Sequence, residues 1–512
     1  MTTSSQDRRD DGYAGAIARG TLFNLLGTVA RLGHPLFLLV VTWLWGSAFA
    51  GLYLLALAMM EITASAIIDA PSDATVVFAS HHAEAAAGDD RVRRELHRVL
   101  ATAMRVALGL AIPVAILTLV AGSSLIERFF PEYGEMVPGI YVLGASLIPR
   151  ALSQTAIAAT KAMLHMEHDA LLNGVFHPLA LLGASLLVFA LGGGFLGLLV
   201  AQLVVECLLC ALAWRSLARY VSLRELAAAL VELPADRRVL GFVFPQGLNL
   251  TFNRYITRLD SIMLAAFGLG KSELAYFSTA ALITSNLAQI RMVFSGALAP
   301  VVARLHAARQ REAFEETLGR VCRWTTSMVV PVVCVVIVFR EDLLRLISPD
   351  YGHDSLFVVI LLIPPLGNCA YGLAGACLMF TGHSRTTLAN SLSIAILNTG
   401  LTFLLIPPCG MLGAAVATAM ATSLMTGLQM IELWKLERVA IRWRAVWKPH
   451  LGLAVALLPL ALTWDPAALG AGEKAAVALL SSAAYVGLMA VLRHEELARL
   501  ARRLRARRGP AV

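Results

Sequence analysis

The sequence is poor in charged residues and rich in apolar ones. Only 15% of its 512 residues are Asp, Glu, Lys or Arg, whereas soluble proteins carry roughly 25%. The hydrophobic residues make up 58% of the chain and lie in blocks of about 20, the length that a helix needs to cross a bilayer. The composition therefore excludes an ordinary soluble domain and predicts an all-α, polytopic membrane protein.

Patterns that mark enzymes and metal proteins are also missing. Nearly all of the seven cysteines lie inside apolar segments, and the pair Cys207 and Cys210 has no neighbouring ligand residues. These cysteines are expected to be small buried side chains. We find no zinc spacing, nucleophile elbow or dinucleotide fingerprint, and no connection on one side of the membrane is long enough for a catalytic domain. The sequence predicts a protein that is not an enzyme and needs no metal or cofactor.

Fourteen apolar segments are predicted to span the membrane. They lie near 17–45, 50–80, 98–121, 136–160, 169–190, 194–214, 239–267, 273–303, 320–340, 355–380, 386–406, 410–433, 449–464 and 474–492. We expect six regions along the chain: a disordered cytoplasmic N-terminus (1–16), an N-lobe of six helices (17–214), an amphipathic cytoplasmic linker (215–238), a C-lobe of six helices (239–433), two further helices (434–492) and a basic cytoplasmic tail (493–512).

Basic residues predict the orientation of the chain. The formal net charge is +8, but the Lys and Arg residues concentrate in alternate connections between apolar segments, which argues for membrane topology rather than nucleic-acid binding. The opposite set of connections holds only Arg128, Lys271, Arg340, Arg345 and Lys474. Because positive residues stay in the cytoplasm, we expect a multi-pass protein of the cytoplasmic membrane with both termini inside the cell.

The two halves of the chain repeat each other. PEYG at 131–134 returns as PDYG at 349–352, and GFLGLLVAQLV at 194–204 returns as GMLGAAVATAM at 410–420. This register pairs the first predicted helix with the seventh and the sixth with the twelfth, so both halves keep the same orientation in the membrane. The pattern predicts two six-helix bundles related by a parallel repeat, followed by two C-terminal helices.

Cations inside the predicted spans are the main functional signal. A charge in the bilayer interior is costly and usually faces a wet cavity, and guanidinium groups suit phosphate oxygens. The predicted seventh helix carries polar side chains along one face. We predict a cationic substrate cavity formed by Arg31, Arg150, Arg254, Arg258, Arg291, Asn24, Gln246, Asn249 and Asn253. A dry polar network between helices is the alternative.

Embedded acids are fewer and allow two interpretations. Glu61, Asp69 and Asp260 could bind a coupling ion, H⁺ or Na⁺, or could neutralise the arginines. Glu61 fits both equally, whereas Asp260 fits an arginine partner better. His34, which precedes Pro35, fits a structural histidine at a kink better than a proton relay.

The duplicated six-helix plan, the cationic segment RYITRLDSIMLAAFG (254–268) and Tyr276 at the start of the next helix resemble the polysaccharide transporter family of the multidrug/oligosaccharidyl-lipid/polysaccharide flippase superfamily. The resemblance implies a flippase for undecaprenyl-pyrophosphate-linked oligosaccharide repeat units, working by alternating access in O-antigen (lipopolysaccharide), capsule or exopolysaccharide biosynthesis. Its implied partners are this lipid-linked substrate, membrane lipids, and the glycosyltransferases and polymerase of the same pathway.

Other functions stay open at this point. A multidrug or cation antiporter of the same superfamily usually has twelve helices and relies on embedded acids, and a lipid II flippase has fourteen helices but a different arginine pattern on its first helix. A membrane glycosyltransferase or polymerase would need a sizeable external loop, which the spacing of the apolar segments does not leave.

Overall fold

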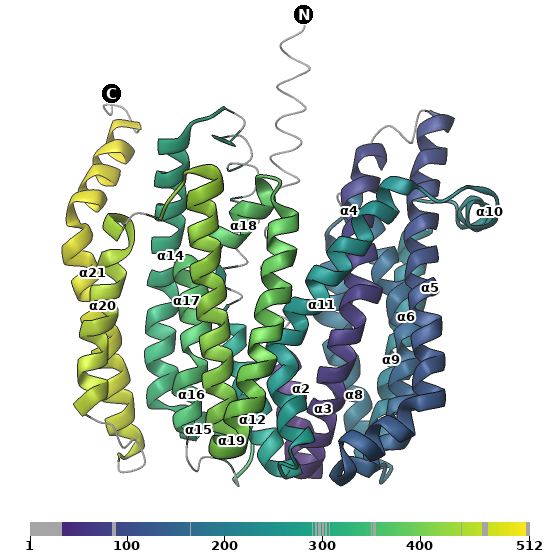
Figure 1. The fold of residues 1–512 in the computed structure, drawn as a ribbon, viewed down its shortest axis with the longest axis horizontal. Coiled ribbons are helices and arrows are strands. Elements are labelled where there is room, and N and C mark those ends of the chain that lie inside the picture. The colour runs from purple at the N-terminus through teal and green to yellow at the C-terminus, as the bar shows by residue number, and fades with distance from the viewer. Residues whose placement is uncertain are drawn as a thin grey trace, which may run out of the picture. The chain divides into compact units, whose positions relative to one another are not determined.

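We describe the protein from a computed structural model. The structure describes residues 33–83, 89–163, 165–288, 290, 291, 294, 298, 302, 305, 306, 308–349, 351, 355–441, 443–462 and 469–507. Every regular element in these ranges is a helix (Figure 1). The chain divides into two compact units, Met1–Ser278 and Thr279–Val512, which we call unit 1 and unit 2 and treat separately.

Unit 1 contains the predicted N-lobe and the helix that follows the linker. Its described elements are α2 (Gly33–Trp45), α3 (Ser47–Ala64), η1 (Ser65–Asp69), α4 (Ala70–Ala83), α5 (Asp90–Phe129), η2 (Pro131–Met136), α6 (Val137–Ala162), α7 (Glu167–Asp169), η3 (Ala170–Phe176), α8 (His177–Ala190), α9 (Phe195–Leu217), α10 (Leu223–Glu232) and α11 (Arg237–Ala266). Helix α12 (Lys271–Asn286) begins in unit 1 and crosses its boundary.

Small residues let α6 pack closely inside unit 1, where it contacts α4, α5 and α9. Ala156, Ala159 and Ala162 of α6 are buried. A side chain at Gly144 would collide with Thr118 of α5, because an added Cβ would lie 1.9 Å from the Thr118 hydroxyl. Close helix approach through small residues is how membrane helices gain van der Waals contact, since lipid supplies no hydrophobic force between them.

Two segments of unit 1 wind as π-helix rather than α-helix. The segment η1 joins α3 to α4 within one continuous span, and η3 leads into α8. A π-helical turn shifts the faces of the helix on either side of it, and such turns are frequent at functional sites. In this chain η1 ends at Asp69 and η3 contains Asn173, so both turns place a polar side chain.

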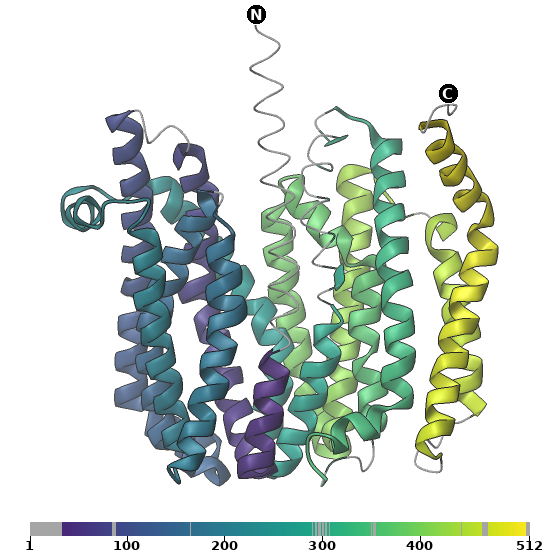
Figure 2. The same cartoon turned by 180° about the vertical axis from the view of Figure 1, so that it is seen from behind.

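The linker between the repeated halves is an amphipathic helix held against α5. Helix α10 runs across the bundle helices rather than along them (Figures 1 and 2). Its buried side chains Leu226 and Ala229 join the same apolar cluster as Leu96 and Leu100 of α5. Ser222 caps its N-terminus by accepting a hydrogen bond from the Glu225 amide.

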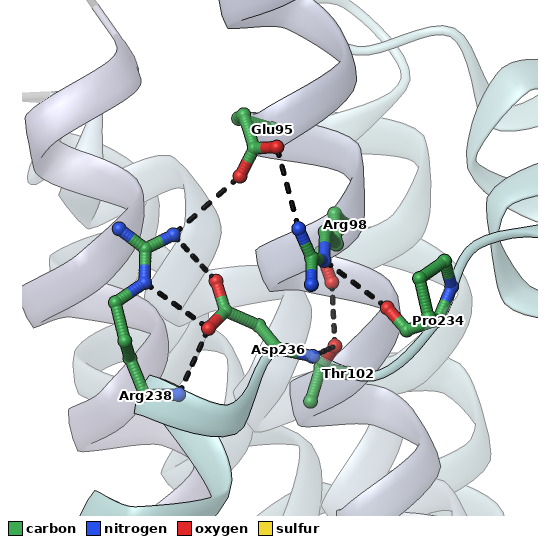
Figure 3. Close-up of polar contacts among 6 residues, drawn as sticks. All are labelled: Glu95, Arg98, Thr102, Pro234, Asp236 and Arg238. Atoms are coloured by element: carbon green, nitrogen blue, oxygen red, sulfur yellow. Dashed lines mark hydrogen bonds and ion pairs between the residues drawn. The ribbon is translucent and has the colours of Figure 1, made fainter.

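Polar contacts fix the end of this linker (Figure 3). Arg98 of α5 donates to the Pro234 carbonyl at 3.1 Å, and the hydroxyl of Thr102 accepts from the Asp236 amide at 3.0 Å. Asp236 in turn caps α11 and accepts from the Arg238 guanidinium at 2.6 Å. The start of α11 is therefore tied to α5.

Unit 2 contains long helices and one broken span. After α12, its described helices are α14 (Arg311–Val338), α15 (Arg340–Arg345), α16 (Leu356–Leu361), α17 (Ile363–Tyr371), α18 (Leu373–Phe380), α19 (Ser384–Glu437), α20 (Trp443–Leu462) and α21 (Ala471–Arg507). The span Leu356–Met379 bends by 52° at Gly372. Helix α19 contains two predicted spans that meet at Gly410, whose φ of 53° breaks the helical path.

The two C-terminal helices pack on unit 2. Tyr485 and Met489 of α21 and Ala456 of α20 form an apolar cluster with Val330 and Cys334 of α14, and both views show α20 and α21 side by side (Figures 1 and 2). Lys474, which is 4% exposed, bonds both oxygens of Asp342 at 2.7 and 3.0 Å.

The all-α, polytopic membrane architecture is confirmed. Within the described residues, eight helices are long and apolar enough to span a membrane, or nine if the bent pair is one span. The expected total of fourteen stays a prediction, because part of the first and eighth segments lies outside those residues and the polar α11 is not among the eight. The lobe boundaries also stay predictions, although by its contacts α11 belongs to unit 1.

Candidate functional site

Helix α11 presents polar side chains to α3, η1 and α4 of unit 1. It begins at the Asp236 cap and continues through Pro245, and its apolar residues Ile256, Leu259 and Leu264 are buried. The Thr251 hydroxyl accepts from Ser65 of η1 at 3.2 Å. The polar face of α11 that the sequence predicts therefore contacts the span Ser47–Ser80, which contains α3 and η1 and most of α4.

The closest contact in this set joins Arg258 to Glu61. The guanidinium donates from Nε to Oε2 at 2.7 Å and from Nη2 to Oε1 at 3.1 Å. The exposed fractions of these side chains are 15% for Arg258 and 22% for Glu61. Two parallel bonds are the strongest arrangement of this ion pair, so the carboxylate neutralises Arg258 in this structure.

Arg254, one turn earlier on α11, is held more loosely. Its guanidinium lies 4.0 Å from Oε2 of Glu61 and 4.0 Å from Oδ2 of Asp69, beyond hydrogen-bond distance. Half of its side chain is exposed. Among the described arginines of α11, Arg254 is therefore the one with donors available to a bound anion.

The predicted amide residues line the same helix. Gln246 donates to Asp73 at 2.9 Å, and Asn253 donates to the carbonyl of Asn249 at 2.7 Å. Asn249 and Asp260 are buried in unit 1 at 9% and 5% exposure. Gln246 thus joins α11 to α4, while Asn253 is engaged by its own helix.

A second embedded ion pair involves a residue that the sequence analysis did not consider. Arg150 of α6 donates from Nη1 to Oε1 of Glu206 at 3.3 Å, and Nε2 of His177 lies 3.2 Å from the same oxygen. Glu206 is 1% exposed. The signal was present in the sequence, because Glu206 is the only charged residue of the α9 segment before Arg215.

Arg291 lies in unit 2 and has a different environment. Its Nη1 donates to the carbonyl of Gly372 at 3.1 Å, at the break between α17 and α18. Among the described residues no carboxylate pairs with it, and its buried Nε has no hydrogen-bond partner there. The remaining predicted cavity residues, Asn24 and Arg31, lie outside the described residues, and nothing of the His34 side chain is described.

Three predicted arginines of unit 1, Arg150, Arg254 and Arg258, lie beside Glu206, Glu61 and Asp69. Two of these three have a bonded carboxylate, and Arg254 does not. The cationic cavity as a whole stays a prediction. Within the described residues, no group of three or more His, Cys, Asp or Glu side chains could hold a metal ion.

Comparisons with known proteins agree with this fold. A family model described as "Polysaccharide biosynthesis protein" matches residues 108–351. The lipid II flippase MurJ in an inward closed conformation has a similar structure, with a TM-score of 0.69, 12% identity, and coverage of 93% of this chain and 99% of its own. No curated protein matches the sequence.

Two other solved structures share the architecture. A multidrug resistance MATE family transporter of the MOP superfamily, in its inward-facing conformation, has a TM-score of 0.64 at 16% identity, covering 82% of this chain and 94% of its own. A MOP superfamily transporter from Pyrococcus furiosus has a TM-score of 0.59 at 16% identity, covering 83% and 95%. The family model thus matches a little less than half of this chain, and the solved structures show that the chain shares the fold of MATE and MurJ transporters.

Proposed function

We propose that this protein flips undecaprenyl-pyrophosphate-linked oligosaccharide repeat units across the cytoplasmic membrane by alternating access, for O-antigen, capsule or exopolysaccharide synthesis. The observation that carries the proposal is Arg254, a half-exposed guanidinium in a membrane protein that keeps its nearest carboxylates 4.0 Å away. The family match to polysaccharide biosynthesis proteins supports the substrate class.

The chemistry of the site suits a diphosphate. A guanidinium presents a planar fork of donors to phosphate oxygens, and its attraction is stronger where water is scarce. Arg258 lies one turn from Arg254, so a second phosphate group could reach it only by displacing Glu61. We therefore expect Arg254 to receive the head group first and Arg258 to engage when Glu61 moves or takes up a proton.

Transport then needs the head group alone to enter the polar region while the lipid tail stays in the bilayer. Rocking of the lobes would expose the head group on the other side, as in transporters built from parallel repeats. In this proposal both termini are cytoplasmic, and the enzymes that make and polymerise the repeat unit are the pathway partners. Glu61, Asp69 and Asp260 are candidates on the polar face for H⁺ or Na⁺ coupling.

The test is export of glycan by variants of Arg254. We expect Arg254→Ala to abolish export while the protein still inserts into the membrane, because the Arg258–Glu61 pair is left intact. The double variant R254A/R258A should be equally inactive. Arg128→Ala is the matched control, since it removes the same charge from the exposed end of α5. Normal export by both Arg254 variants would disprove the proposal.

One observation favours a second candidate, a cation antiporter. Asp73 is exposed and the Asp69 side chain is 44% exposed, so this face also offers carboxylates to a cationic substrate. Proteoliposomes that exchange an organic cation for protons, with loss of exchange in Asp69→Asn and Asp73→Asn but not in Arg254→Ala, would support the antiporter instead.

A further inference from the structure

Two embedded glutamates of unit 1, Glu61 and Glu206, differ in how many of their carboxylate oxygens have a hydrogen-bond donor. Each oxygen of Glu61 has its own donor from Arg258. In Glu206 both neighbours, Arg150 and His177, lie against Oε1, and Oε2 is buried without a hydrogen-bond partner among the described residues. A buried oxygen without a partner is unfavourable and requires an explanation such as water, an ion or a proton.

A second buried polar atom of unit 1 also has no hydrogen-bond partner in the described part of the chain. The hydroxyl of Tyr53 makes no hydrogen bond among the described residues, although the side chain is 2% exposed. Tyr53 lies on α3, which packs against α6, the helix of Arg150. Unit 1 therefore buries two polar atoms that a proton or another polar group could satisfy.

The charges around Glu206 favour a proton over a metal ion. The ionisable groups in contact with Glu206 are Arg150 from α6 and His177 from α8, and Cys210 lies one turn further along α9. Lys161, also on α6, pairs with Asp169 instead. A hard metal ion needs several oxygen ligands, whereas this site offers one carboxylate that already lies against a guanidinium.

We propose that Glu206 and His177 together bind the coupling proton of this transporter. The inference rests on the proposed function for its role in transport, but the site itself does not. Histidine normally titrates near pH 6.5, and two groups in contact share a proton as a pair. Arg150 and Glu206 cancel each other, so the added proton leaves the cluster with one positive charge.

The proton changes what Arg150 can do. Protonated His177 is a second cation that competes with Arg150 for Oε1 of Glu206. The Arg150 side chain is 29% exposed and is then freer to bind an anion. Proton binding and anion binding on unit 1 should therefore favour each other, because linkage between two sites is reciprocal.

The first experiment needs no substrate. Infrared difference spectra of the purified full-length protein are recorded between one pH below and one pH above the ordinary histidine pKa. We expect a component that disappears in both Glu206→Gln and His177→Gln but persists in Glu61→Gln. A component that survives in E206Q and H177Q would overturn the proposal. If E206Q does not fold because Arg150 loses its partner, R150Q/E206Q removes both charges at once.

The second experiment measures coupling in proteoliposomes with an undecaprenyl-pyrophosphate oligosaccharide that carries a fluorescent sugar. For one coupled proton, each unit of imposed pH difference changes the accumulation ratio by about tenfold. The wild type should show this response, and H177Q should transport without it. A wild-type response in H177Q would overturn the coupling role. Absence of transport in the wild type would instead count against the proposed function, while the infrared result still decides the site.

Discussion

In unit 1 the guanidinium of Arg258 lies against both oxygens of Glu61, whereas in unit 2 the guanidinium of Arg291 meets only the carbonyl of Gly372 among the described residues. The first arginine is neutralised by a carboxylate, and the second is placed at the C-terminal end of a broken helix, where backbone carbonyls carry partial negative charge. The two units therefore stabilise these embedded cations by different means, one with a carboxylate and the other with a backbone carbonyl.

Two asparagines at matching positions of the repeat, Asn173 and Asn390, both bond a carboxylate. Asn173 donates to Asp169, four residues earlier, whereas Asn390 donates to Glu432, 42 residues later in α19. The kind of contact is therefore shared between the units, but the carboxylates do not stand at matching positions of the repeat.

The largest expected effect is a difference in stability between variants of Arg258 and Arg291. Arg258→Ala removes both donors of a partly buried Glu61, and breaking such a pair typically costs about 3 kcal/mol of unfolding free energy. Arg291→Leu leaves no carboxylate stranded and also removes a buried charge, so we expect a change of about 1 kcal/mol or less. Denaturant titration of both variants in the same lipid–detergent mixture measures the difference.

A neutral pair serves as the control for this prediction. E61Q/R258Q replaces both charges with amides that can still bond each other, and it should recover most of the loss seen in R258A. Equal destabilisation by R258A and R291L would mean that the carboxylate in unit 1 contributes nothing beyond the carbonyl in unit 2.

The hydrophobic pattern predicted the architecture well, and particular residues show why. Apolar blocks of sufficient length became α5, α9 and α14, because a lipid-facing segment must satisfy its own backbone and can do so only as a helix. The predicted gap between 386–406 and 410–433 lies at Gly410. The 52° bend at Gly372 was not expected, although Pro364, Pro365 and Gly372 lie in that segment.

The sequence predicted which residues belong to the candidate site, but it did not predict which arginine pairs with which carboxylate. Helical spacing placed Arg254 and Arg258 on one face of α11, yet which of them would meet Glu61 depends on the π-helical turn η1 and on how α11 packs on α3. Glu206 was overlooked because a single acidic residue among apolar neighbours does not interrupt the hydrophobic pattern of a predicted span. Distances between helices that are far apart in sequence are not contained in a helical periodicity, so the neutralised state of Arg258 and Arg150 required the structure.

A smaller effect concerns how firmly unit 1 holds the start of α11. The side chain of Arg238 bonds Asp236 and, together with its backbone amide, holds the pKa of that carboxyl below its ordinary value. The resulting stabilisation is complete above the ordinary aspartate pKa of about 3.9 and is lost as the pH falls through the lower folded-state value. Asp236→Ala should cost about 1 kcal/mol as a lost helix cap, and this cost should shrink below pH 4.

Thermal unfolding at neutral and acidic pH measures this effect. Asp89→Ala is the matched control, because Asp89 caps α5 through the Arg91 amide and no arginine side chain in the described part of the chain bonds it. An acid-dependent loss of the same size in both variants would show that the Arg238 side chain adds nothing to the cap.

The smallest expected change tests whether α11 moves with unit 1, as its contacts suggest, or with unit 2, as the repeat in the sequence suggests. A Cβ added at Gly247 of α11 would lie 3.6 Å from the Cβ of Ala66 in η1, within the range that a disulfide requires. We expect A66C/G247C to cross-link on oxidation and to transport at the same rate as its reduced form, because the bond would lie inside one rigid body. Mass spectrometry confirms the bond, and C207S and C409S substitutions remove the two exposed native thiols. Loss of transport that returns on reduction would instead show that the contacts of α11 with η1 open during each cycle, and that the Arg258–Glu61 pair is part of a gate.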